Sequence, residues 1–126
     1  MPRILVVDDE PDVRDLVTAL LADLGYEIDG ADGGAAALDR LAAQTYDLVV
    51  SDLRMPEVDG VAVYRAVQAG PSPRPAVLFM SGFTNAAELV PFLCETGTRV
   101  VAKPFDVPEL RLAVRQLVTS AGRPAA

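Results

Sequence analysis

Short apolar segments alternate along the chain with longer segments whose apolar residues recur at helical spacing. Most of the short segments are nearly continuous runs of Val, Ile, Leu and Ala, which is typical of parallel strands covered on both faces. The segment 26–31 instead alternates apolar and polar residues, which favours the edge of a sheet. The predicted strands are Ile4–Val7, Tyr26–Ala31, Leu48–Ser51, Ala76–Met80 and Val100–Ala102.

The first and last helices are predicted from clear periodicity. Pro11 lies in the first turn of the first helix and Gly25 follows its end, an asymmetry typical of helices. The last helix repeats the same apolar spacing from Leu110 to Val118. One face of the first helix is predicted to be apolar and to consist of Val13, Leu16, Val17, Leu20, Leu21 and Leu24.

Three further helices are predicted with weaker periodicity. Two of them, near 34–43 and 59–69, have alanine-rich faces. The other, around 85–95, contains Pro91, which is expected to kink it or delay its start. Strict alternation of strands and helices predicts one doubly wound α/β domain with helices on both faces of a parallel sheet. We expect this domain to span residues 1–120, followed by a flexible tail at 121–126.

Composition excludes several classes of function. The chain carries 11 Lys plus Arg against 18 Asp plus Glu, a net charge of −7, which argues against binding to nucleic acid or to anionic lipid. It contains no histidine, so imidazole catalysis and histidine-based zinc sites are excluded. No apolar run is long enough to span a membrane and no signal-peptide pattern is present, so a cytoplasmic location is expected. The single cysteine, Cys94, is interpreted as a small buried apolar residue.

Polar residues stand where the predicted strands end. Asp8-Asp9-Glu10 follows the first strand, Asp52 the third, Ser81-Gly82 the fourth and Lys103-Pro104 the fifth. Ligands of open α/β sheets bind outside the carboxyl ends of the strands, where the winding reverses. The sequence therefore predicts one polar site at this edge of the sheet.

The residue types indicate the chemistry of this site. Asp8, Asp9 and Asp52 would bring three like charges together, and a hard divalent cation with oxygen ligands, Mg²⁺, would relieve their repulsion. Lys103 adds a positive charge, and Ser81 offers a hydroxyl donor. The carboxylate of Asp52 is the natural nucleophile for a phosphoryl group, because acyl phosphates form on aspartate.

Each residue also has an ordinary structural interpretation. Asp8 and Asp9 would serve as caps of the first helix, since Asp is a favoured N-cap residue, and Asp9 could do both jobs. Asp52 alone would be a strand-end residue, Ser81-Gly82 a turn and Lys103 a solvated surface charge. Their occurrence at successive strand ends, with side chains suited to one reaction, favours the functional interpretation.

With these motifs the sequence resembles the receiver domain of two-component response regulators. Ser81-Gly82 and the lack of an aromatic residue at Val100 resemble receivers attached to hybrid histidine kinases, and a free-standing relay regulator fits equally well. The resemblance rests on Val7-Asp8-Asp9-Glu10, Asp52-Leu53-Arg54-Met55-Pro56 with Asp59-Gly60, Ser81-Gly82 and Lys103-Pro104-Phe105. It implies a (βα)5 flavodoxin-like fold with strand order 2-1-3-4-5. It also implies a signalling module rather than a turnover enzyme, although one that assists its own phosphorylation and dephosphorylation.

The resemblance implies a role for each matching residue. Asp52 would be phosphorylated, and Mg²⁺ would be bound by Asp9, by Asp52, by Asp8 through water and by the backbone carbonyl of Arg54. Lys103 and Ser81 would contact the phosphoryl group, and the Lys103-Pro104 bond would be cis. The donor would be a phosphohistidine of a histidine kinase or histidine phosphotransfer protein. The output would be a downstream protein read in trans or a fused domain.

The sequence departs from the family pattern at Val100, where many receivers carry an aromatic residue that moves on activation. Phe83 is a second variable position, and its ring is expected to hinder water and prolong the phosphorylated state. Phe92 and Leu112 lie off the core stripes and are candidates for contact with a partner.

Other classes of function remain as alternatives. One is a small Mg²⁺-dependent phosphatase with an Asp nucleophile, of the haloacid-dehalogenase type, although no cap domain is evident. Another is a binding module that keeps the fold without phosphorylation, against which the complete set of acids speaks. A dinucleotide-binding function is excluded because no Gly-x-Gly-x-x-Gly follows the first strand.

Overall fold

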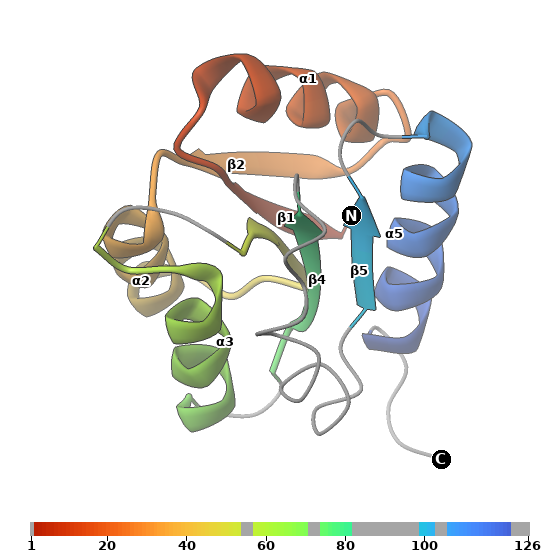
Figure 1. Ribbon diagram of the computed structural model, residues 1–126. Helices are drawn as coiled ribbons and strands as arrows, with labels where there is room; N and C mark the ends of the chain where they lie inside the picture. The colour runs from red at the N-terminus through yellow and green to blue at the C-terminus, as the bar shows by residue number, and fades with distance from the viewer. Residues whose placement is uncertain (1, 54–56, 71–73, 82–98, 103–105, 122–126) are drawn as a thin grey trace.

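The computed structural model describes residues 2–53, 57–70, 74–81, 99–102 and 106–121. Within these ranges a five-stranded parallel sheet has the order β2-β1-β3-β4-β5 (Figure 1). This confirms the predicted fold class and strand order, with the alternating segment at one edge. The strands are β1 (Arg3–Val7), β2 (Glu27–Ala31), β3 (Leu48–Asp52), β4 (Ala76–Ser81) and β5 (Arg99–Ala102).

The central strands β1, β3 and β4 are mainly apolar, as expected where helices cover both faces of a sheet. Figure 1 shows α1 (Pro11–Ala22) and α5 (Val107–Ala121) on one face, and α2 (Gly34–Ala43) and α3 (Gly60–Ala69) on the other. Successive side chains of a strand point to opposite faces. Accordingly Ile4 and Val6 pack in the core under α1 and α5, whereas Leu5 and Val7 pack in the core under α2 and α3.

The predicted helices 34–43 and 59–69 are confirmed as α2 and α3. Both ends of α1 have the residues expected there. Pro11 is its first residue, and Gly25, three residues after its last, has a φ of 92°. The predicted helix around 85–95 lies outside the described residues, as do Cys94 and residues 122–126. No helix in the described parts of the chain is long and apolar enough to cross a membrane.

The prediction that Leu16 belongs to the buried face of the first helix is wrong. Its side chain is 51% exposed, whereas Val17 and Leu21 are fully buried. Each helical residue turns by roughly 100°, so Leu16 lies about 100° from Val17, at the margin of the apolar stripe. The part of the α1 surface that the sheet and α5 bury is narrower than the row of apolar residues in the sequence of the helix.

Candidate metal and phosphoryl-acceptor site

The carboxyl ends of two adjacent strands bring three acids together. β1 pairs with β3 so that Val7 lies beside Ser51. Asp8 and Asp52 are the residues that follow this pair in the two strands. Asp9 follows Asp8 directly. One carboxylate oxygen each from Asp8, Asp9 and Asp52 lies within 4.8 Å of the other two. Adjacent strands of a parallel sheet therefore build the acidic cluster that the sequence predicted.

The three acids differ in exposure. Asp8 is fully buried and Asp52 is 7% exposed, whereas Asp9 is exposed. Burying a charged carboxylate raises the free energy of the folded state unless hydrogen bonds or cations compensate the charge. This applies to Asp8 and Asp52. Hard divalent cations prefer carboxylate oxygens, and the exposed Asp9 leaves such an ion a route from solvent. The cluster could hold a metal ion.

Asp8 is held at its amide and at its carboxylate. Its backbone N–H donates to the carbonyl oxygen of Ala31 at 3.2 Å, which extends the β1–β2 ladder by one residue. Its Oδ1 accepts from the backbone N–H of Glu10 at 2.9 Å. The N-cap residue of α1 is Glu10, which makes no capping bond with its side chain. The alternative that Asp8 or Asp9 is the N-cap residue of the first helix is therefore wrong.

The backbone around Asp52 is fixed by close contacts. Asp52 is the last residue of β3 and lies beside Met80 of β4. Its carbonyl oxygen accepts the hydroxyl of the buried Ser51 at 3.0 Å. The N–H of Leu53 donates to the carbonyl oxygen of Met80 at 3.0 Å, so the chain is still tied to β4 one residue beyond the acid.

The Asp59-Gly60 pair begins α3 against this segment. Asp59 is the N-cap residue, and its Oδ1 accepts from the N–H of Ala62 at 2.9 Å. Gly60 donates its N–H to the carbonyl oxygen of Leu53 at 3.1 Å, and a Cβ at Gly60 would collide with the carbonyl oxygen of Asp52. The start of α3 therefore packs directly on the backbone of the acceptor residue.

A hollow of ≈ 310 Å³ opens beside Asp9. Small residues at the start of α2, among them Gly33 and Gly34, line it together with Asp32 and Glu57. Its acidic walls suit the approach of a cation or of a cationic partner surface. It is the solvent-facing approach to Asp9.

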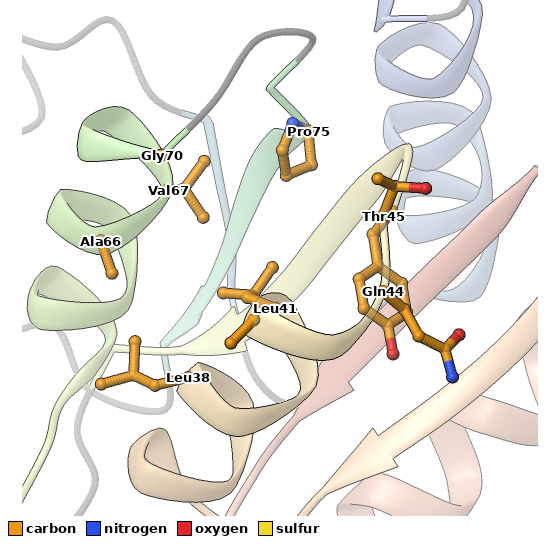
Figure 2. Close-up of a pocket in the computed structure, with 10 residues that line it drawn as sticks. Leu38, Leu41, Gln44, Thr45, Ala66, Val67, Gly70 and Pro75 are labelled. Carbon is orange, nitrogen blue, oxygen red and sulfur yellow. The ribbon is translucent and has the colours of Figure 1, made fainter.

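A second hollow, of ≈ 260 Å³, lies between α2 and α3 (Figure 2). It is lined mainly by apolar side chains, including Leu38, Leu41 and Val67, and no charged side chain is among its lining residues. Such walls offer no carboxylate to a divalent cation. Of the two sites, the acidic cluster is the candidate for binding a cation.

The other predicted site residues are described only in part. Ser81 is the last residue of β4, pairs with Ala102 of β5 and so lies at the same end of the sheet as Asp52. Its side chain is outside the described part of the structure. Arg54, Phe83, Phe92, Lys103 and Pro104 are outside it altogether. Val100 packs, partly buried, in the core beneath α2 and α3, and Leu112 is 56% exposed as expected.

Sequence reasoning missed Arg14 and Ser51. The guanidinium Nη1 of Arg14 donates to the carbonyl oxygen of Asp8 at 2.9 Å. The signal for Arg14 was a basic residue one turn inside a helix that begins beside an acidic cluster. The signal for Ser51 was a polar residue within the apolar run of the third strand. Neither signal identifies the hydrogen-bond partner.

Comparison with known proteins assigns the family. The sequence model of the response regulator receiver domain matches residues 4–115. The chain belongs to the response regulator receiver family. It is 30% identical to the response regulator receiver protein CpdR of Brucella abortus, over 96% of this chain and 100% of that protein. It is 35% identical to the regulatory protein AtoC of Escherichia coli, over 90% of this chain but only 24% of AtoC.

A solved structure supports the same assignment. The response regulator TrrA of Thermotoga maritima, crystallised in complex with Mg²⁺–BeF, has a TM-score of 0.81 and 33% sequence identity, covering 93% of this chain and 99% of that chain. The receiver domain is therefore a signalling module of two-component systems. Response regulators partner with histidine kinases and output domains, and their receiver domains generally bind Mg²⁺.

Proposed function

We propose that this receiver domain accepts a phosphoryl group on Asp52 in a Mg²⁺-dependent reaction and thereby switches a downstream partner. The observation that carries the proposal is the convergence of Asp8, Asp9 and Asp52, whose carboxylate oxygens lie within 4.8 Å of one another. The bound Mg²⁺–BeF of the related TrrA supports the same assignment.

The transfer needs a nucleophile at the sheet edge and a cation to offset charge. An oxygen of Asp52 attacks phosphorus in line, forming a P–O bond, while the P–N bond to a phosphohistidine breaks. The leaving imidazole keeps the bonding electron pair and takes up a proton. Asp9, Asp52, Asp8 through water and the backbone carbonyl of Arg54 would hold Mg²⁺, which would offset the negative charge on the phosphoryl oxygens.

Two further side chains complete the proposed site on the strength of the family motifs. Lys103 pairs with the phosphoryl oxygens, and Ser81 donates its hydroxyl to one of them. The phosphoryl group carries a charge of about −2 where the carboxylate carried about −1, and this charge, held by the cations of the site, biases a two-state equilibrium of the domain. We assign the phosphoacceptor domain to residues 1–120.

The phosphohistidine lies outside these 126 residues, because they contain no histidine. A histidine kinase or a histidine phosphotransfer protein is the proposed donor. The output is a protein read in trans or a fused domain. The chain spans 24% of AtoC, so both arrangements have to be tested on the natural protein.

The proposal is tested by incubating the chain with acetyl phosphate or phosphoramidate and Mg²⁺, followed by intact mass measurement. We expect a gain of one phosphoryl group that is absent in Asp52→Asn and absent when EDTA is added. Asp9→Asn should abolish the Mg²⁺ dependence together with most of the gain.

Two outcomes would contradict the proposal. A mass gain that survives Asp52→Asn would place the acceptor elsewhere. Multiple turnover on a small phosphate ester, with no stable covalent form, would instead favour a phosphatase.

A further inference from the structure

Arg14, in the first turn of α1, bonds the segment between β1 and α1 with both its backbone and its side chain. Its backbone N–H donates to the carbonyl oxygen of Glu10 at 3.0 Å. Its Nη1 reaches back and donates to the carbonyl oxygen of Asp8 at 2.9 Å, in a partly buried contact. The segment that carries the two adjacent acids, Asp8 and Asp9, is therefore held from both ends by one residue.

The Arg14 side chain lies against Gly30 of β2, where a Cβ would touch it and a larger side chain would compete for its space. A Cβ at Gly30 would lie 3.4 Å from Cδ of Arg14 and 3.8 Å from its Cγ and Nε. Gly30 lies beside Val6 in the β1–β2 ladder, two residues before Asp8. The arginine stem thus crosses the bare backbone of β2, which directs the guanidinium toward the end of β1.

The bonded carbonyl oxygen belongs to the peptide group that joins Asp8 to Asp9. The amide and carboxylate of Asp8 are already held, by Ala31 and Glu10 respectively. Asp9 is exposed, so packing does not fix its direction. The orientation of this peptide group decides where Asp9 leaves the strand and where its carboxylate points.

We propose that Arg14 is a positioning residue for the metal-binding acids, and that Gly30 enables this role. The hydrogen bond from Arg14 to the Asp8 carbonyl preorganises Asp9 toward Asp52 and strengthens the binding of a divalent cation. Partners of this kind, one shell outside the ligands, orient metal ligands in many sites. The inference rests on the proposed function of the cluster as a Mg²⁺ site.

The sign of one measurement separates this role from a pure charge effect. A guanidinium near the cluster repels a cation, so removal of its charge alone would strengthen Mg²⁺ binding. Loss of the positioning hydrogen bond would weaken it instead. Arg14→Met keeps the length of the stem and removes both the charge and the donor.

The experiment is a Mg²⁺ titration of the full chain, followed by the amide NMR signals of Asp9 and Asp52. We expect Arg14→Met to raise the dissociation constant roughly 10-fold, the size typical for loss of such an outer partner. Arg14→Lys, which keeps a donor and the charge, should recover most of the affinity. Arg115→Met is the matched control, because it removes the same charge from an exposed position on α5.

A double-mutant cycle tests the part played by Gly30. Gly30→Val should displace the arginine stem and weaken Mg²⁺ binding in the natural background. In Arg14→Met it should change the affinity little, because the hydrogen bond is already gone. Equal effects of Gly30→Val in both backgrounds would contradict the role of Gly30.

Thermal unfolding in EDTA separates positioning from stability. If Arg14 only stabilised the fold, Arg14→Met would lower the unfolding temperature and leave the Mg²⁺ affinity of the folded chain unchanged. That result would overturn the inference. Tighter binding by Arg14→Met overturns it as well. If Arg14→Met does not fold, Arg14→Lys and Gly30→Val decide the question. A natural chain that binds no Mg²⁺ refutes the proposed function itself, and the inference with it.

Discussion

The backbone of Gly60 lies against the carbonyl oxygen of Asp52, so that the first residue of α3 is in contact with the main chain of the proposed phosphoacceptor. A Cβ at Gly60 would collide with this oxygen and would lie 2.9 Å from Cα of Leu53. Both obstacles are backbone atoms, which cannot turn aside as a flexible side chain would. Only glycine allows α3 to begin so close to the acid.

Gly60→Ala should therefore force the segment after β3 to move. We expect a loss of about 1–3 kcal/mol of unfolding free energy, the usual cost of overpacking, and weaker binding of Mg²⁺. Gly33→Ala at the start of α2 is the control, since a Cβ there meets no atom within 4 Å. Chemical denaturation and a Mg²⁺ titration of both variants provide the comparison. Similar behaviour of the two variants would show that the contact at Gly60 relaxes without cost.

Glu57 has a φ of 66°, the left-handed region that residues with a Cβ rarely adopt. This conformation costs roughly 1–2 kcal/mol for most L-residues and less for Asn or Gly. Glu57→Asn should raise the unfolding free energy by about 0.5–1 kcal/mol. Glu57→Gln is the control, because it removes the charge and keeps the strain. A gain shared by both variants would point to the charge of Glu57 in its acidic hollow instead.

The order of the elements and the acidic cluster were predictable, because apolar runs and terminal polar residues are local features of the chain. The exact strand ends were not. Asp52 and Ser81 extend β3 and β4 by one residue each because Met80 and Ala102 lie beside them in neighbouring strands. Hydrogen bonding to the neighbouring strand decides where a strand ends, and the apolar composition of a segment does not predict this pairing.

Tertiary contacts account for the other differences. Arg14 was not predicted as part of the site because its bond to Asp8 depends on the path of α1 over β2, where the arginine stem lies beside Gly30. Leu16 was misplaced because helical periodicity does not give the width of the surface that covers a helix. The strained φ of Glu57 leaves no mark on apolar patterning at all.

The side chain of Asp59 caps α3, since its Oδ1 accepts from the N–H of Ala62 at 2.9 Å. Asp59→Ala leaves that donor without this acceptor and should cost about 1 kcal/mol of unfolding free energy. Glu10→Ala is the matched control, because Glu10 is the N-cap residue of α1 but forms no capping bond with its side chain. Urea unfolding should show a lower midpoint for Asp59→Ala only. Equal losses at the two positions would mean that helix-end charge, and not the capping bond, is responsible.

The environment of the Tyr46 phenol determines how the free energy of unfolding should change at alkaline pH. Tyr46 is 5% exposed, and its hydroxyl donates to Oδ2 of Asp29 on β2 at 2.7 Å. Burial, followed by the hydrogen bond to this carboxylate, raises the pKa of Tyr46 to about 12 from its ordinary value of 10.0. The folded chain therefore holds the phenolic proton more tightly than the unfolded chain does.

The sign follows from linkage. Between pH of about 10 and 12 the folded state binds more protons than the unfolded state, so stability falls as the pH rises through this window. Below pH of about 10 the contribution is fully present, on the order of 2 kcal/mol. Tyr46→Phe should unfold more easily near neutral pH, because Asp29 loses its donor, and should lose less stability between these two pH values. Urea unfolding of both proteins across the window measures the difference. Parallel curves for the two proteins would show that Tyr46 titrates in the folded state as an ordinary exposed phenol does.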